Sequence, residues 1–388
     1  MKIVHICQYY NDGYGYQENL LPKYQAKLGH EVVVITSDRG SYFIGEKKPK
    51  IVSPGQYTDN GIRIIRLGIS REFKGRYVRF INLFDAIKRE CPDYIFHHGL
   101  TAPSVFEVVK YKQEYPQAKT ALDNHGDYAN SGRFIFWRLA YYRFYWKSRL
   151  KRVHSTVDRY FSITPHCKAF AENELGVPSV KHVLLPLGVD EEMTYYSPEW
   201  RKSIRKHYGI QEADFTIITL GKFNKRKKLE VLIEVIKRLN NKRVKLFIVG
   251  SFLKGYDTEI DSLIGNASGF IKIGWVEQNQ IYKYLSAADL AVFPGGQSVI
   301  WQQAISTGLP TIFQYWPGIE YLKIREDIDF LRSNNVEELV TLIQTAYNRF
   351  VDTKSSHVRY NDLSFSYRKI ASMSIEEVFT NSKRLEIF

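Results

Sequence analysis

The stretch "KIVHICQYYNDGYGYQENLLPKYQAKLGHEVVVITS", residues 2–37, decides the fold. Its ends, residues 2–10 and 30–37, are largely apolar runs of strand length, and residues 18–29 between them have the composition of a helix that ends at Gly29. A helix between two strands is the usual connection of parallel strands, because the chain must return to the same end of the sheet. The stretch therefore predicts a parallel sheet covered by helices.

The same pattern continues along the chain. In the first half, residues 93–99 and 119–127 are short strand-like runs that end in His, Gly or Asp. After residue 200 the pattern restarts, with strand-like runs at 214–221, 244–250, 270–276 and 290–295. These runs alternate with helical segments, which is typical of a doubly wound α/β sheet.

The length of the chain predicts more than one domain, because 388 residues exceed what one hydrophobic core usually organises. We expect an α/β protein with two facing Rossmann-like domains, residues 1–195 and 196–370, and a ligand cleft between them. A C-terminal helix over 371–388 is expected to pack back on the first domain.

Charge and cysteine content limit the classes of partner and compartment. The 55 Lys and Arg residues exceed the 41 Asp and Glu residues, and the net charge of +14 implies an anionic partner: nucleic acid, a lipid surface or a phosphorylated ligand. Cys7, Cys91 and Cys167 are far apart and lack metal-ligand spacing, which favours a reducing compartment. No signal-peptide pattern and no run of about 18 apolar residues is present. We therefore expect a cytoplasmic protein.

The basic stretch "LGKFNKRKKLEVL", residues 220–232, is the clearest candidate ligand site. Its cations stand between a predicted strand end at Gly221 and a predicted helix: Lys222, Lys225, Arg226, Lys227 and Lys228. Cations and unpaired amide groups at a helix amino terminus favour phosphate. A solvated basic loop is the alternative. A P-loop is excluded, because its glycine spacing and the Ser or Thr after its lysine are absent.

The order of the motifs resembles the retaining nucleotide-sugar glycosyltransferases of family four, which have two facing Rossmann-like domains, the GT-B fold. Residues 221–228 are similar to a basic motif after the first strand of that family's second domain. "PLGVD" at 186–190 resembles its "PNGVD", and "AADLAVFPG" at 287–295 resembles its "AD…PS" strand. The resemblance implies that Lys222 and Lys227 bind the donor diphosphate and stabilise the leaving group.

The stretch "FPGGQSVIWQQAISTGLPTIF", residues 293–313, departs from the family. The family has two glutamates eight positions apart, and Gly295 and Gln303 stand there instead. Gln303 keeps a carbonyl acceptor for the ribose hydroxyls. The turn keeps backbone amides for the diphosphate, although a plain strand-to-helix turn is the alternative. The resemblance implies these donor-binding residues: Gly15, Lys222, Lys227, Val276, Gly295, Gly296, Ser298, Val299 and Gln303.

Two shorter segments contribute to that assignment. "GWV", residues 274–276, matches the segment that cradles the base in the family, and Trp275 could stack on the base or lie in the core. "DGYGYQE", residues 12–18, resembles a glycine loop below the phosphates and places Gly15 there. A dinucleotide site ending at Asp38 is the rival interpretation, but Glu18 occupies its third glycine position.

Histidines at two predicted strand ends are candidates for the first domain. "FHHGL", residues 96–100, resembles the family's "HxHG", and "DNHGDY", residues 123–128, ends the next strand. By themselves such histidines are more often structural. The resemblance implies His125, Asp127, Lys222 and Lys227 as catalytic residues, and His98 and His125 as residues on the acceptor side.

Residues 131–157, "SGRFIFWRLAYYRFYWKSRLKRVHSTV", contain no Asp or Glu. On a helix one face would be aromatic: Phe134, Trp137, Tyr141, Phe144 and Tyr145. Such a helix suits the surface of an anionic membrane, and the expected membrane contacts are Arg133, Trp137, Arg138, Arg143 and Lys147. A core helix with a solvated basic side is the alternative. No nucleic-acid module signature is present, so no nucleic-acid partner is expected.

The resemblance implies a retaining hexosyltransferase, peripheral on the cytoplasmic face of the membrane. It would transfer a sugar from a nucleotide diphosphate, UDP more readily than GDP, to a glycan or lipid-linked acceptor in surface polysaccharide or glycoconjugate synthesis. We interpret Asp327 and Asp329 in "EDIDF" as a solvated turn, and expect neither a metal nor a cofactor. The alternatives are a GT-B-type sugar-nucleotide epimerase and a catalytically impaired nucleotide-sugar-binding protein.

Overall fold

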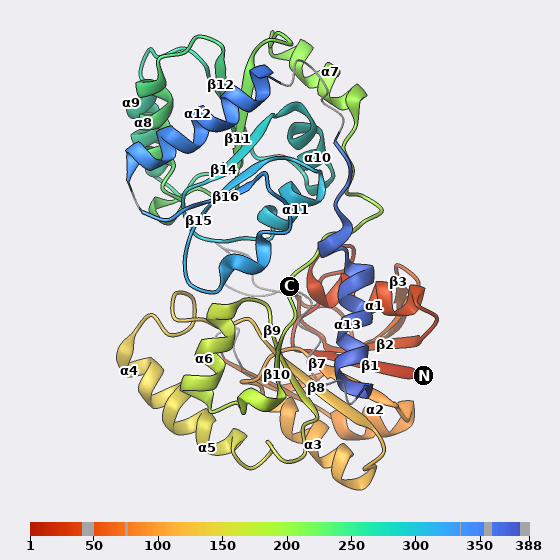
Figure 1. Cartoon of the computed structure of the whole chain (residues 1–388). Coiled ribbons are helices and arrows are strands. Elements are labelled where there is room, and N and C mark those ends of the chain that lie inside the picture. Colours follow the sequence, from red (N-terminus) through yellow and green to blue (C-terminus); the bar gives the residue numbers. More distant parts are fainter. Residues whose placement is uncertain (41–49, 74–76, 334, 353–358, 381–388) are drawn as a thin grey trace. The chain divides into compact units, whose positions relative to one another are not determined.

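The computed structural model describes residues 1–40, 50–73, 77–333, 335–352 and 359–380. Its contacts divide the chain into two compact units (Figure 1). Unit 1 is Met1–Leu187 with the C-terminal segment from Tyr367, and unit 2 is Gly188–Ser366.

The sequence predicted a domain boundary after residue 195, whereas unit 1 of the structure ends at Leu187. The reason is that the next segment is bonded to unit 2: Val189 forms a bridge with Ser366, and Thr194 Oγ1 donates to Tyr282 Oη over 2.8 Å. The last helix, α13 (Tyr367–Phe379), begins earlier than the predicted 371, and residues 381–388 of that prediction lie outside the described residues.

Unit 1 contains a sheet of eight strands, parallel except at one edge. Its order is β10 (His182–Leu184), β9 (Arg159–Ser162), β8 (Lys119–Asn124), β7 (Tyr94–His97), β1 (Lys2–Cys7), β2 (Glu31–Ser37), β4 (Ile62–Leu67) and β3 (Gly55–Asp59), and only β3 is antiparallel to its neighbour. A separate antiparallel hairpin joins β5 (Ile69–Phe73) to β6 (Tyr77–Phe80). Central strand β1 is buried along almost its whole length, as expected of a parallel sheet covered on both faces.

The helices of unit 1 cover this sheet. They are α1 (Gln17–Lys27), α2 (Leu83–Glu90), α3 (Ser104–Glu114), α4 (Ile135–Trp137), the π-helical η1 (Arg138–Trp146), α5 (Lys147–Leu150), α6 (Pro165–Leu175), the 3₁₀ turn η2 (Ser179–Lys181) and α13. Figure 1 shows α13 beside α1, although they lie at opposite ends of the sequence. Gln25 of α1 and Tyr94 of β7 both donate to Ser374 of α13, each over 2.9 Å.

Unit 2 contains a fully parallel sheet. Its order is β13 (Phe270–Gly274), β12 (Val244–Val249), β11 (Phe215–Leu220), β14 (Leu290–Phe293), β15 (Thr311–Gln314) and β16 (Ile328–Leu331). The helices around it are α7 (Pro198–His207), η3 (Lys225–Lys227), α8 (Leu229–Leu239), α9 (Tyr256–Ile264), α10 (Gln278–Ala287), α11 (Ile300–Ser306), η4 (Ile319–Leu322), α12 (Val336–Asp352) and η5 (Leu363–Phe365). The predicted α/β class with parallel sheets is confirmed.

The strand order of both sheets reverses at one point, between β1 and β7 in unit 1 and between β11 and β14 in unit 2. Loops that follow neighbouring strands diverge to opposite faces there, so a crevice opens at the carboxyl ends of the strands. Each unit therefore has a defined place for a ligand.

A buried carboxylate fixes α7 to the sheet of unit 2. Asp289, directly before β14, accepts hydrogen bonds from Thr216 N (2.7 Å) and Arg205 Nη1 (3.1 Å), and it lies 2.8 Å from Arg201 Nη2. Both arginines also donate to the Ala287 carbonyl. Asp289 is thus the shared counter-ion of two buried guanidinium groups of this helix.

We predict that Asp289→Asn lowers the free energy of unfolding of unit 2 by roughly 3–5 kcal/mol, because it leaves buried guanidinium charge uncompensated. Urea unfolding would measure the loss. The matched control is Asp261→Asn, since the carboxylate of Asp261 is 59% exposed and pairs with Lys272 at the surface. That variant should change stability by no more than about 1 kcal/mol. Equal losses in the two variants would contradict the assignment.

Candidate functional site

Two loops of unit 2 meet at its switch point. The loop after β11 carries Lys227, and the loop after β14 carries Gly296. Lys227 Nζ donates to Gly296 O over 2.6 Å and lies 3.4 Å from Ser298 Oγ, while Gly296 N donates to Arg226 O over 3.0 Å. The structure thus brings together two segments that the sequence indicated separately.

Gly295 allows this close approach. A Cβ atom at Gly295 would lie 2.3 Å from Arg226 O and 2.6 Å from Lys227 Cα, which real Cβ atoms do not tolerate. A glutamate at this position could therefore not be accommodated unless the two loops moved apart. The absence of the family's first glutamate follows from the way the loops pack.

The lysines of the first loop are not equivalent. Burial, with the neighbouring Arg226, lowers the pKa of Lys227 to about 8. Lys225 pairs with Glu259 at the surface, and Lys228 Nζ donates to Gln314 Oε1 over 3.3 Å. Lys222 is exposed. In the described structure the Lys227 ammonium contacts a carbonyl and a hydroxyl, so an incoming anion would compensate its charge.

Two further residues of unit 2 follow strands of its sheet: Gln303 belongs to α11, which comes after β14, and Trp275 comes directly after β13. Gln303 is 4% exposed, and no described residue donates a hydrogen bond to its Oε1. Trp275 follows β13 and is 70% exposed, which excludes the core interpretation of this residue. Val276 beside it is half-buried. Gln303 therefore offers an unused acceptor, and Trp275 offers an open ring face.

Unit 1 has a polar pocket of about 300 Å³ at its own switch point. Residues after β1, β7 and β8 line it, among them Tyr9, Glu18, His98, Asp123 and His125. Glu18 stands in the first turn of α1, so the predicted glycine loop does lead to this pocket, although Gly15 does not line it. His98 and His125, which the sequence predicted at two strand ends, thus line the same pocket.

Asp123 is the centre of a buried hydrogen-bond network. Its Oδ2 lies 3.2 Å from both His98 Nδ1 and His125 Nε2, and its Oδ1 accepts from Gly99 N over 2.7 Å. On the far side, His98 Nε2 lies 3.1 Å from His5 Nδ1. His5 Nε2 in turn bonds Gln25 Oε1 over 2.6 Å, so the network reaches across the sheet to α1.

Charge in this network is concentrated on the pocket side. Burial, with the charge of His98, lowers the pKa of His5 to about 3, so His5 is neutral. Burial disfavours the charged forms of Asp123 and His125. The attraction between the two groups is stronger than this effect and keeps both charged. The pKa of Asp123 falls well below its usual range, and the pKa of His125 rises to about 9. His125 therefore presents an imidazolium to the pocket at neutral pH.

Asp127 does not take the role that the sequence suggested. Its carboxylate accepts from the backbone of Ala129 (2.8 Å) and Asn130 (2.6 Å), which closes the turn after His125. The carboxylate beside His125 is Asp123. Its signal was present in the sequence, because side chains two positions apart at a strand end point to the same side.

The acid-free segment 131–157 divides its aromatic residues between two faces. Tyr142, Trp146 and Leu150 are buried in the core of unit 1, whereas Phe134, Phe136 and Phe144 are exposed. Four of the five aromatic residues that the sequence placed on one face line one groove of the structure: Phe134, Trp137, Tyr141 and Tyr145. Phe144 does not line it, since residues 138–146 form a π-helix and its wider i→i+5 turn shifts the positions that share a face.

The cations of this segment are partly neutralised by α6. Arg143 donates to Glu174 through two bonds of 3.1 Å, and Arg138 Nε lies 3.7 Å from the same carboxylate. Lys147 Nζ lies 3.5 Å from the Asn173 carbonyl oxygen. Arg133 lies over the Phe134 ring, 5.7 Å from its centroid. Three of the predicted membrane contacts thus also bind the helix beneath them.

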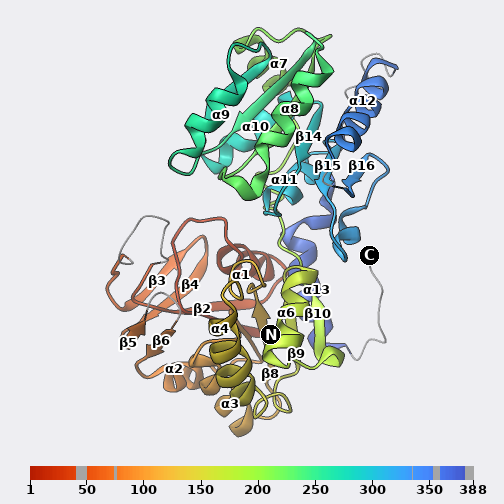
Figure 2. The same cartoon turned by 90° about the vertical axis from the view of Figure 1, so that its left-hand side faces the viewer.

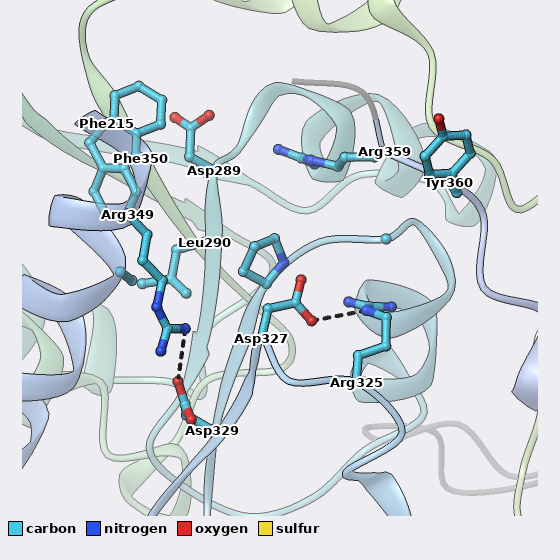
Figure 3. A pocket seen from close by; sticks show the side chains of 13 residues that line it. Phe215, Asp289, Leu290, Arg325, Asp327, Asp329, Arg349, Phe350, Arg359 and Tyr360 are labelled. Carbon is cyan, nitrogen blue, oxygen red and sulfur yellow. Dashed lines mark hydrogen bonds and ion pairs between the residues drawn. The ribbon is translucent and has the colours of Figure 1, made fainter. Parts of the chain in front are cut away.

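Unit 2 contains a cavity of about 440 Å³ at the opposite edge of its sheet, where β11, β14, β15 and β16 begin (Figure 3). Two of its three arginines have protein carboxylates as partners: Arg325 lies 2.9 Å from Asp327, and Arg349 lies 3.9 Å from Asp329 (Figure 3). Asp329 belongs to β16, so only Asp327 precedes the strand as a turn residue. The third arginine, Arg359, donates to the Leu285 carbonyl over 3.1 Å.

Within the described ranges, no group of three or more His, Cys, Asp or Glu residues is placed to hold a metal ion. The helices of the same ranges include none that is long and apolar enough to span a membrane.

Comparison with known proteins identifies relatives for both halves of the chain. Residues 20–193 match the family described as Glycosyltransferase Family 4, and residues 214–349 match the one described as Glycosyl transferases group 1. A processive diacylglycerol alpha-glucosyltransferase from Acholeplasma laidlawii is 24% identical over 244 residues, which are 61% of this chain and 71% of that protein.

Solved structures share the fold over nearly the whole chain. The catalytic domain of starch synthase IV from Arabidopsis thaliana, bound to ADP and acarbose, has a TM-score of 0.67 at 12% identity, over 97% of this chain and 98% of that one. HepE from Anabaena in complex with UDP has a TM-score of 0.63 at 14% identity, over 98% and 96% of the two chains. The chain therefore belongs to the glycosyltransferases, with a family 4 domain followed by a group 1 domain and the two Rossmann-like folds of the GT-B class.

Proposed function

We propose that this glycosyltransferase transfers a hexose from UDP-sugar to a glycan or lipid-linked acceptor with retention of configuration, at the cytoplasmic face of a membrane. The observation that carries the proposal is the Lys227 ammonium, half-buried between two loops at the switch point of unit 2. Its present partner is the Gly296 carbonyl, and the nearby loop backbone can donate to a phosphate. The polar pocket of unit 1 supplies the acceptor side.

The donor diphosphate would lie against the loops after β11 and β14. Lys227 and the exposed Lys222 would bind its oxygens, together with amides of the turn at Gly295, Ser298 and Val299, whereas the Gly296 amide already donates to Arg226 O. A ribose hydroxyl would donate to Gln303 Oε1, whose lack of a partner is otherwise costly in a buried position. The base would lie by Trp275 and Val276. Binding of UDP by the structural relative HepE supports UDP as the nucleotide.

The reaction needs no carboxylate at positions 295 or 303. The bond between the anomeric carbon and the diphosphate oxygen breaks, and the acceptor oxygen bonds to the same face of that carbon. The acceptor proton passes to the departing phosphate oxygen. Lys227 and Lys222 stabilise the negative charge that develops on this diphosphate, which is where fixed cations are most effective.

The acceptor side would be organised by His125 and His98. The His125 imidazolium would donate a hydrogen bond to an oxygen of the bound sugars, and Asp123 would hold both rings in position. Glu18, on the opposite side of the pocket, would accept a bond from an acceptor hydroxyl. Gly15 would contribute only through the backbone of its loop.

Membrane contact would involve the exposed part of the 131–157 segment. Trp137 and Arg133 face outward without a carboxylate beside them in the described structure, whereas Glu174 offsets part of the charge of Arg138 and Arg143. The electrostatic attraction should therefore be weaker than the count of cations suggests. The lipid named for the Acholeplasma relative supports a membrane setting.

Lys227→Ala should weaken UDP binding by roughly 1.5–3 kcal/mol, the range of a charge-assisted hydrogen bond. Isothermal titration calorimetry would measure this loss. Lys225→Ala is the matched control, because it removes a cation from the same turn that is paired with Glu259. That control should bind UDP normally. Unchanged affinity in Lys227→Ala would refute the donor assignment.

The affinity for UDP should depend on pH through Lys227. Its pKa is about 8 in the free protein, and a bound diphosphate would raise it, because a nearby negative charge favours the ammonium. Binding should therefore be strongest below pH 8 and fall as pH rises, by up to about tenfold per pH unit. Titrations from pH 7 to 9.5 would test this. Lys227→Ala should give a flat profile, and a flat wild-type profile would contradict the linkage.

Asp123→Asn should move the pH range of sugar transfer. The His125 pKa is about 9 because Asp123 outweighs burial, so removing the carboxylate should lower this pKa, while Glu18 continues to raise it. Transfer by the wild type should decline only above about pH 9, and transfer by the variant should decline at a lower pH. The affinity for UDP should stay unchanged. A variant that loses activity equally at every pH would contradict this role of Asp123.

A further inference from the structure

Unit 1 contains an apolar groove of about 650 Å³ that the proposed reaction does not use. Its lining residues come from the β5–β6 hairpin and from the segment α4–η1. Figure 2 shows β5, β6 and α4 in unit 1. The groove is lined by Arg71, Phe73, Tyr77, Phe134, Trp137, Tyr141 and Tyr145. All but one of these side chains are aromatic, and none is acidic.

The ring faces in the groove are open to solvent. Phe134 is 69% exposed, Phe73 is 55% exposed and Trp137 is 40% exposed. Trp137 stacks on Tyr141 at 4.5 Å between ring centroids, and Tyr141 stacks on Tyr145 at 6.1 Å, so these rings form one continuous wall. A concentrated apolar surface of this kind marks a binding site, because covering it with another apolar group is favourable.

Both walls of the groove are attached to the polar pocket that contains His98 and His125. On the hairpin side, Tyr9 of the pocket donates to Glu72 over 3.1 Å, and Gln8 of the pocket accepts from Val78 N over 2.8 Å. These partners are the sequence neighbours of Phe73 and Tyr77.

The helical wall has the same connection. Tyr141 of the groove packs edge-on against Tyr142 of the pocket, with 5.0 Å between ring centroids. The pocket and the groove therefore have the β5–β6 hairpin and the α4–η1 segment as common neighbours, which is why we treat them as two parts of one acceptor site.

We propose that the groove holds the hydrocarbon chain of a lipid-linked acceptor, whose hydroxyl-bearing head occupies the polar pocket. This proposal rests on the proposed function and narrows its acceptor from a glycan or a lipid to a lipid. A water-soluble glycan has no apolar segment that would cover these rings.

A hydrocarbon chain fits the groove better than a peptide does. A peptide carries a backbone donor and acceptor at nearly every residue, and each needs a partner when it is buried. The groove offers one guanidinium and the phenol groups of its tyrosines, which cannot pair a peptide segment. A hydrocarbon chain needs no polar partner, and the acid-free rim with Arg71 suits the negative charge of a phosphate-linked lipid.

The test uses single-chain probes that remain monomeric. n-Alkyl phosphates and n-alkyl glucosides with four to ten carbons, below their micelle concentrations, would be titrated into the full chain by calorimetry. Affinity should rise roughly threefold to fourfold per added methylene, which corresponds to about 0.8 kcal/mol. The slope should be the same for both head groups, because the chain alone enters the groove.

Variants would locate the binding site. Phe73→Ala and Trp137→Ala should each weaken decyl phosphate binding by about tenfold, and Phe73→Leu should recover most of the loss. Phe144→Ala is the matched control, because Phe144 lies on the same helix, is 71% exposed and does not line the groove. It should bind decyl phosphate normally. UDP affinity, which depends on unit 2, should be unchanged in all four variants, and thermal unfolding followed by circular dichroism would show that unit 1 folds in each of them.

The outcomes separate this proposal from the proposed function. If UDP binds but probe affinity is independent of chain length, the groove does not hold a chain and the donor assignment stands. Binding to anionic vesicles without binding of monomeric probes would also overturn the groove and leave only a surface contact. Equal losses in Phe144→Ala and Phe73→Ala would place the chain elsewhere. Failure of UDP binding in the wild type would instead refute the proposed function.

Discussion

Parallel strand pairing is the constraint on which the rest of this structure depends. Parallel strands end at the same edge of the sheet, so the loops after β1, β7 and β8 must meet in unit 1, and those after β11 and β14 must meet in unit 2. The residues proposed to bind the substrates, such as His98, His125 and Lys227, lie in those loops. At the strand reversal of unit 2, the two loops contact each other through Lys227 and Gly296.

Both units place a cation at their switch points, but the two cations differ in what compensates their charge. In unit 1, a buried carboxylate at Asp123 supports the imidazolium of His125, so the cation in the pocket has a fixed counter-ion behind it. In unit 2, the half-buried Lys227 ammonium contacts a carbonyl and a hydroxyl. The first arrangement orients a donor of hydrogen bonds, and the second leaves positive charge for an anionic ligand to compensate.

The two missing glutamates have different structural consequences. At Gly295 the backbone of the neighbouring loop fills the space that a side chain would need. At Gln303 the amide keeps the length and the carbonyl acceptor of a glutamate but brings no charge into a buried position. Catalysis that depends on lysines and on the departing phosphate is compatible with both changes. The substitutions are therefore no reason to regard the protein as inactive.

The sequence by itself determined the parallel sheets, the second α/β domain and the basic loop around Lys227, because strand period, helix stops and clustered charge are local signals. Only the tertiary structure showed that Asp123 rather than Asp127 supports His125, that Glu174 neutralises Arg138 and Arg143, and that Trp275 is exposed. It also divided the aromatic residues of the 131–157 segment between the core and the groove. These outcomes depend on which element packs against each side chain, and the contacts that decide them join residues far apart in the sequence.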